Sequence, residues 1–145
     1  MTAPSIGIKD LLVAASVGQF SADGSTMGTW PIFISKLPAE PHSVIVVYDS
    51  VGKEPDPKWL LDYPGVAITV RAHDYVTCYN KARDVNSALL GLMGQTINGD
   101  WWGSIRGVGG LVFMGRDEKD RVMFSINYQL IITPAETSLD IRQPL

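Results

Sequence analysis

The segment that most constrains the fold runs from residue 115 to residue 132 and reads GRDEKDRVMFSINYQLII. From Val122 to Ile132 every second position is apolar, and most positions between them are polar. This period of two is typical of a β-strand with one buried face. Residues 111–114 are also strand-like, and a glycine and a run of charges separate them from this strand. The sequence therefore predicts a β-hairpin with an exposed turn at residues 115–120.

The remaining periodicities predict two helices and four further strands. The first helix is expected to have Ser5 as its N-cap and to end at Gly18, and the second to cover residues 75–92 with Asp74 as its N-cap. Besides residues 122–132, strands are predicted at residues 32–37, 43–48, 66–72 and 105–114. The run 43–48, SVIVVY, is apolar without alternation, which predicts a central strand that is buried on both faces.

The connecting segments complete the predicted fold. Residues 19–29, 49–57 and 95–103 are expected to be loops, and residues 134–145 are expected to form a tail that is mobile in the free protein. The order α, β, β, β, α, β, β predicts one α+β domain over residues 1–145. Its single mixed, largely antiparallel sheet would have four to five strands with two helices packed on it. A chain of 145 residues can bury a core of its own without disulfides or metals.

Charge and cysteine content argue against several classes of protein. The net charge is −3, whereas domains that hold nucleic-acid phosphates usually carry a basic stripe. The single cysteine, Cys78, excludes an internal disulfide framework and fits a chain made in a reducing compartment. The N-terminal segment lacks a basic n-region, and no window approaches the ~20 apolar residues of a membrane span. We expect neither a secretion signal nor a membrane contact.

No residue pattern predicts catalysis. His73, Asp74 and Cys78 lie close together, but their spacing does not place them on one helical face, so Asp74 is expected to cap the helix and Cys78 to pack beneath it. The glycines at residues 107–110 are not followed by the Lys-Ser or Lys-Thr of a phosphate-binding loop. No Gly-x-Ser-x-Gly motif accompanies either histidine. The sequence predicts no enzyme, no cofactor and no metal site.

Two other features indicate contacts between protein chains. The charged turn has alternating signs, which suits either a solvated hairpin or pairing with another copy of the chain. Adjacent tryptophans in a polar loop are hard to bury together in a small core, and tryptophan is favoured at interfaces. The candidate subunit-interface residues are Arg116, Asp117, Glu118, Lys119 and Arg121, and the candidate partner contacts are Trp30, Trp101 and Trp102.

Four stretches between residues 44 and 132 carry a resemblance to a known family. They are VVYD at residues 46–49 followed by Gly52, YPG at 63–65 leading into ITVR at 68–71, a helix with Tyr75, Tyr79, Lys81 and Ala82, and MGRDEKDRVMFSINYQL at 114–130. The most specific part is GRDEK at 115–119 with Arg121 and FSIN at 124–127. Together these stretches resemble the tail terminator, or minor capsid, proteins of long-tailed bacteriophages.

The resemblance implies a structural protein of the virion at the tail–neck junction, made and assembled in the host cytoplasm. Such proteins form a ring, a hexamer in the family, on the head-proximal end of the tail tube, where they stop tail polymerisation. The implied partners are other copies of the chain, the tail tube protein and head-completion or connector proteins. DNA is expected to pass through the lumen without specific binding, because a ring of acidic chains does not hold phosphates.

The resemblance also gives roles to particular segments. The charged turn is expected at or beside the subunit contact, while residues 19–30, residues 95–103 and the tail after residue 134 are expected to be ordered by partners. Two alternatives stay open. One is another neck role, as a head-completion or connector-adaptor protein. The other is a small cytosolic enzyme or ligand-binding domain that uses residues 73–78.

Overall fold

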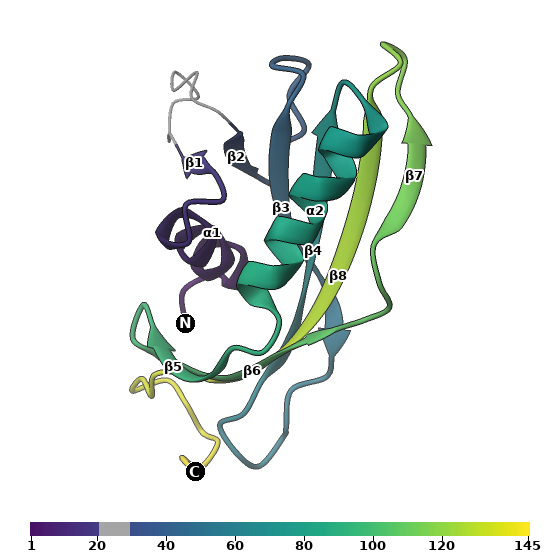
Figure 1. Ribbon diagram of the computed structural model, residues 1–145. Helices are drawn as coiled ribbons and strands as arrows, with labels where there is room; N and C mark the ends of the chain where they lie inside the picture. The colour runs from purple at the N-terminus through teal and green to yellow at the C-terminus, as the bar shows by residue number, and fades with distance from the viewer. Residues whose placement is uncertain (21–29) are drawn as a thin grey trace.

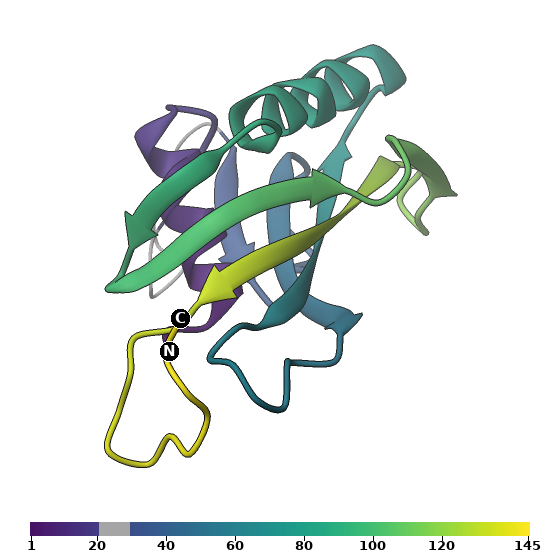
Figure 2. The ribbon, with the colours of Figure 1, turned by 90° about the horizontal axis from the view of Figure 1, so that it is seen from below.

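The computed structural model describes residues 1–20 and 30–145. Helices α1 (Pro4–Ala14) and α2 (Tyr75–Leu89) lie on the same face of a curved β-sheet, as Figures 1 and 2 show. Most of the loop predicted at residues 19–29 lies outside the described residues. Its first two residues form the short strand β1 (Gln19–Phe20) instead of a loop.

The described residues form one sheet of eight strands. After β1 these are β2 (Pro31–Ile34), β3 (Val44–Lys53), β4 (Tyr63–Ala72), β5 (Met93–Ile97), β6 (Asp100–Gly107), β7 (Val112–Arg116) and β8 (Val122–Thr133). The strand order is β1-β2-β3-β4-β8-β6-β5, with β7 also beside β8. The pairs β1–β2 and β2–β3 are parallel and the others are antiparallel. The predicted mixed, largely antiparallel α+β fold is confirmed, but the predicted count of four to five strands is wrong.

Much of the extra sheet comes from residues 95–103, which were predicted to be a loop. These residues belong to the β5–β6 hairpin, whose turn is Asn98-Gly99. Asn98 has a φ of 53° and Gly99 a φ of 84°. A two-residue type I′ turn, which matches the twist of antiparallel strands, requires positive φ at both central residues. Asn-Gly is its preferred sequence. The loop prediction is therefore wrong, although the pair Asn98-Gly99 in the sequence indicates a hairpin turn.

Strand β8 is the longest strand and organises the sheet. It pairs with β4 on one side, while on the other side its first half pairs with β7 and its second half with β6. Its residues alternate without exception between buried and half-buried, so the predicted one-sided strand is confirmed. The strand predicted at residues 105–114 is divided, because the chain leaves the sheet between Gly107 and Val112 and turns at Gly109, where φ is 78°.

Strand β3 is buried on both faces over its first four residues, Val44–Val47, as its sequence predicts. Ile45 and Val47 belong to the core beneath the helices. Val44 and Val46 point to the opposite face, which the connection between the parallel strands β2 and β3 passes at Pro41 and His42. Arg71, which pairs with Val44, donates hydrogen bonds to carbonyls of this connection.

The first helix is capped differently from the prediction. Ser5 lies inside α1 and is buried. The N-cap residue is Ala3, whose side chain cannot form a hydrogen bond. The backbone N–H and the hydroxyl of Ser5 instead donate to the carboxylate of Asp49, at 2.9 and 2.7 Å. Asp49 lies in β3, which continues to Lys53, so the loop predicted at residues 49–57 begins later than expected.

The second helix matches its prediction at its start. The carboxylate of Asp74 accepts a hydrogen bond of 3.0 Å from the backbone N–H of Thr77, which makes Asp74 the N-cap. The helix ends at Leu89, earlier than the predicted residue 92, because the chain turns at Gly91 with a φ of 90°. In the described part of the chain, neither helix has the length and apolar character needed to cross a membrane.

Residues 134–145 are irregular and return to the loop between β3 and β4. Gln143 exchanges backbone hydrogen bonds of 2.8 Å with Lys58 and Leu60. The guanidinium of Arg142 lies 2.7 Å from the carboxylate of Asp62 and also donates to the carbonyl of Asp56. These contacts place residues 134–145 against the β3–β4 loop. The mobility of this tail in the free protein stays a prediction.

Candidate protein-interaction site

The charged turn between β7 and β8 is closed by its own backbone and by one carboxylate. The N–H groups of Asp117 and Asp120 donate to the carbonyls of Arg121 and Asp117, both at 3.0 Å. The carboxylate of Asp117 also accepts from the N–H groups of Lys119 and Arg121, at 3.0 and 2.9 Å. Asp117 therefore shapes the turn and points into it.

Asp117 and Arg121 form an ion pair that is largely removed from solvent. Nε of Arg121 lies 2.7 Å from the Asp117 carboxylate, and another guanidinium nitrogen of Arg121 donates to the carbonyl of Ala39, 82 residues away. Partial burial alone raises the pKa of Asp117, but hydrogen bonds from the Arg121 N–H, the Arg121 guanidinium and the Lys119 N–H outweigh it and lower the pKa below its ordinary value. This pair ties the hairpin to residues 39–42.

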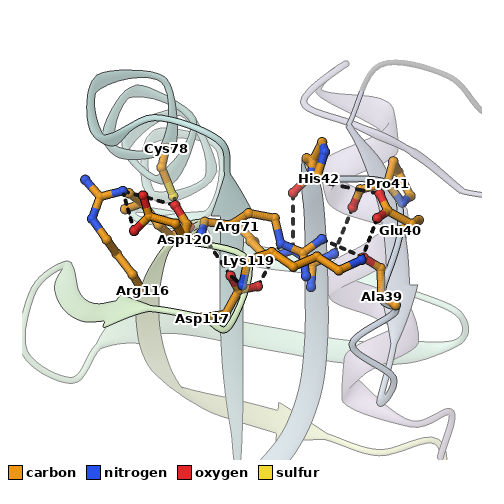
Figure 3. A network of polar contacts seen from close by, with 12 residues as sticks. Ala39, Glu40, Pro41, His42, Arg71, Cys78, Arg116, Asp117, Lys119 and Asp120 are labelled. Carbon is orange, nitrogen blue, oxygen red and sulfur yellow. Dashed lines mark hydrogen bonds and ion pairs between the residues drawn. The ribbon is translucent and has the colours of Figure 1, made fainter.

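The other charges of the turn lie at the surface. Nζ of Lys119 lies 2.8 Å from the carboxylate of Glu40, and both side chains are about half exposed. Nη1 of Arg116 donates to the carbonyl of Asp120 at 3.1 Å and lies 3.7 Å from its carboxylate, and Glu118 is exposed. Figure 3 shows Lys119 reaching across to Glu40, while Arg116 and Asp120 pair with each other away from residues 39–42. Of the predicted interface residues, Arg116, Glu118 and Lys119 are therefore the accessible ones.

The three tryptophans predicted to contact partners have different surroundings. Trp102 is only 2% exposed and its ring lies against Gly7, where an added Cβ would stand 2.4 Å from Cζ2. Trp101 is 48% exposed, because adjacent residues of β6 point to opposite faces. Trp30 is buried, with the ammonium of Lys81 over its ring at 5.1 Å from the ring centroid. Of these three, Trp101 is the one that presents a large accessible surface to another protein.

An exposed apolar surface lies beside the turn, and the sequence analysis missed it. We name it the β7–α2 surface; its members are Tyr75, Val76, Tyr79, Val112, Phe113 and Met114, with exposures between 36% and 63%. The rings of Tyr75, Tyr79 and Phe113 surround that of Phe124 at centroid distances of 5.4 to 5.7 Å. Val112 pairs with Ser125 and therefore points to the other face of the sheet, so the contiguous part of this surface is the aromatic group. Exposed apolar surface marks sites of protein contact, and aromatic residues and Met are enriched there.

The region from His73 to Cys78 has the structural role that the sequence predicts. Cys78 is fully buried and its thiol donates to the carbonyl of Val70 at 3.2 Å. Burial raises the pKa of the Cys78 thiol to about 11, which opposes formation of the nucleophilic thiolate. Within residues 1–20 and 30–145, no group of three His, Cys, Asp or Glu side chains is arranged to hold a metal ion.

A comparison with models of protein families identifies the family of this chain. The model described as "Bacteriophage tail terminator protein" matches residues 11–134. The chain belongs to this family. As a tail terminator family member it is a structural virion protein and not an enzyme, which removes the enzyme alternative and confirms the resemblance found between residues 44 and 132.

A solved structure of a virion contains a chain with a similar fold. The chain is similar to a chain of the "Virion of native gene transfer agent (GTA) particle", with 13% identity and a TM-score of 0.66 over 90% of this chain and 94% of that one. At this identity the similarity concerns the fold alone. A search of curated proteins finds no significant match.

Proposed function

We propose that this tail terminator family member forms a closed ring on the head-proximal end of the phage tail tube. There it stops polymerisation of the tube and joins the tail to the head, at the tail–neck junction. The match of the family model over residues 11–134 is the observation that carries this proposal. The ring is proposed to be a hexamer, assembled in the host cytoplasm, with the tail tube protein and head-completion or connector proteins as its partners.

The β7–α2 surface and the accessible residues of the charged turn form the proposed contact with the next copy of the chain. No described strand pairs with the outer edge of β7, so its backbone N–H and C=O groups remain available for a neighbour. The turn follows β7 directly, so the charged residues come next in the chain after the apolar residues of that strand. A ring requires such a surface to meet a different face of the adjacent copy.

Two matched pairs of variants test this placement. Met114→Glu introduces a charge on the β7–α2 surface, and Leu139→Glu introduces it at an exposed position of the tail. We expect Met114→Glu to reduce the ring population, measured by mass photometry, while Leu139→Glu assembles as the natural chain does. Arg116→Glu should act like Met114→Glu, with Arg83→Glu on the exposed side of α2 as its control. If both test variants assemble like the natural chain and circular dichroism shows intact folds, this region is solvent-exposed surface and not a subunit contact.

The charge of the ring is compatible with passage of DNA. A ring of six copies carries a net charge of −18, six times the −3 of one chain. A predominantly acidic bore repels phosphates, so DNA would slide through it without adhering. A map of the ring whose lumen is lined with Lys and Arg would contradict this part of the proposal.

Electron microscopy of lysates from the phage that encodes this chain, with the gene deleted, tests the proposed function. The terminator role predicts abnormally long tails beside unjoined, DNA-filled heads. Tails of normal length that fail to attach would assign the protein to the head side of the neck instead. Normal infectious particles would refute the proposed neck function.

A further inference from the structure

Two arginines beside the charged turn are buried to a degree that is unusual for charged side chains. Arg71, on β4, is 2% exposed and Arg121, which directly precedes β8, is 4% exposed. Both lie on the sheet face opposite the helices, because Arg71 pairs with Met123 and side chains two residues apart share a face. Buried guanidinium groups normally have carboxylate partners, since an isolated charge inside a protein is costly.

Only one of these two arginines has such a partner. Arg121 pairs with Asp117, whereas Arg71 donates only to the carbonyls of Pro41 and His42, at 2.8 and 3.2 Å. Among the described residues no Asp or Glu forms an ion pair with Arg71, and its Nη1 makes no hydrogen bond to the protein. Burial, and after it the charge of Arg121, lowers the pKa of Arg71 from its ordinary value. The nearby carboxylates are engaged elsewhere, Asp117 with Arg121 and Glu40 with Lys119, so neither is bonded to Arg71.

The unsatisfied side of Arg71 opens onto a small surface pocket. The pocket has a volume of about 310 Å³ and is lined by Leu37, Pro38, Ala39, Arg71, Asp117, Glu118, Lys119 and Arg121. Because no fully buried side-chain nitrogen or oxygen of the described residues lacks a hydrogen-bond partner, the free Nη1 of Arg71 must reach the solvent of this pocket. Apolar side chains from residues 37–39 form one wall. Figure 3 shows Arg71 in the same group as Ala39, Asp117 and Lys119, which line the pocket with it.

We propose that this pocket receives the carboxylate of an Asp or Glu side chain from an adjacent copy of the chain. A guanidinium presents its N–H groups in a planar fork that matches a carboxylate, and the pocket is at the small end of ligand sites, large enough for a side chain. Charge complementarity favours a second copy: the pocket is lined by three cationic and two acidic side chains, an excess of positive charge, while the chain as a whole has 15 acidic against 12 basic residues. The identity of the partner rests on the ring proposed above.

A variant that fills the pocket from within the same chain tests the inference. Ala39 is exposed and only its backbone carbonyl is used in the hydrogen-bond network, so Ala39→Glu adds a carboxylate at the pocket without removing a contact. This carboxylate is expected to occupy the pocket and lower the ring population at least tenfold, measured by mass photometry. The control, Ala14→Glu, makes the same change at an exposed position of α1 and is expected to assemble normally. Equal assembly of the two variants would overturn the proposal.

A second measurement tests the pocket independently of ring formation. Sodium acetate is titrated into the ¹⁵N-labelled protein, against sodium chloride at equal ionic strength, while the Nε–Hε resonance of Arg71 is followed. The inference predicts a saturable shift with acetate that is absent in Ala39→Glu. No shift would refute the carboxylate site itself. If acetate shifts the resonance but Ala39→Glu assembles normally, the carboxylate does not come from a second copy. If deletion of the gene leaves the tails unchanged, the ring is refuted but the acetate site is not.

Discussion

Replacing Trp102 by alanine is expected to destabilise the protein much more than replacing its neighbour Trp101. Trp102 is 2% exposed and packs against Gly7 of α1, whereas Trp101 is 48% exposed. A buried aromatic side chain removes roughly 150–250 Å² from water, and loss of a buried Trp costs about 3–5 kcal/mol. Trp101 buries about half as much, so we expect a loss of about 1–2 kcal/mol for its removal. The difference is a large share of the roughly 5–15 kcal/mol that stabilises a domain.

Urea unfolding followed by far-ultraviolet circular dichroism measures this difference, because tryptophan fluorescence is itself changed by the substitutions. Both variants should keep the m-value of the natural chain, since the surface exposed on unfolding changes little. Gly7→Ala provides a further check: alone it should destabilise, because its Cβ meets the Trp102 ring, and in a Trp102→Ala background it should stabilise by about 1 kcal/mol through helix propensity. Equal losses for Trp101→Ala and Trp102→Ala would refute this account of the pair.

Three further predictions follow from individual side chains. Asp49→Ala should lower the free energy of unfolding by about 1–2 kcal/mol, because Ser5 loses both acceptors, and adding Ser5→Ala to it should cost little more; additive losses in urea unfolding would contradict this. The pKa of Asp117 is lower in the folded state than its unfolded value of about 3.9, so the stabilisation by its charge should be complete above pH 3.9 and be lost as the pH falls through the folded pKa. The difference in free energy of unfolding between the natural chain and Asp117→Asn should therefore shrink in acid. A difference that does not change with pH would contradict this. Cys78, with a pKa raised to about 11, should have about one thiolate in 1,000 at pH 8 and resist iodoacetamide until the protein unfolds, whereas rapid labelling of the native protein would show that the thiol is accessible.

The parts of the fold that were predictable depend on local patterns. Alternation along β8 and the apolar run at the start of β3 each specify how many faces are buried, and Asp74 has the residue type and position of an N-cap. The cap of α1 was not predictable in this way, because its acceptor is Asp49 on a strand 44 residues away. The β5–β6 hairpin, by contrast, has the turn sequence Asn98-Gly99, and the loop prediction for residues 95–103 did not use this signal.

The candidate site was predictable in position but not in detail. The charged turn lies where the sequence predicts it, but the separation of Asp117 and Arg121 from the accessible charges depends on residues 39–42 folding over the sheet. The β7–α2 surface was missed because Tyr75 and Tyr79 fit the helical spacing of core residues. In the structure the buried stripe of α2 consists of Cys78, Ala82, Val85 and Leu89, and the two tyrosines lie at its margin.

The central claim, a ring built through β7 and the charged turn, is tested most directly by a cryo-electron microscopy map of the neck in particles of the phage that encodes this chain. The account predicts a closed ring at the head-proximal end of the tail tube, into which the eight-stranded fold fits with the β7–α2 surface at every subunit boundary and a neighbouring carboxylate at Arg71. A map in which this fold lies elsewhere in the particle, or in which β7 and the turn face solvent between subunits, would contradict it.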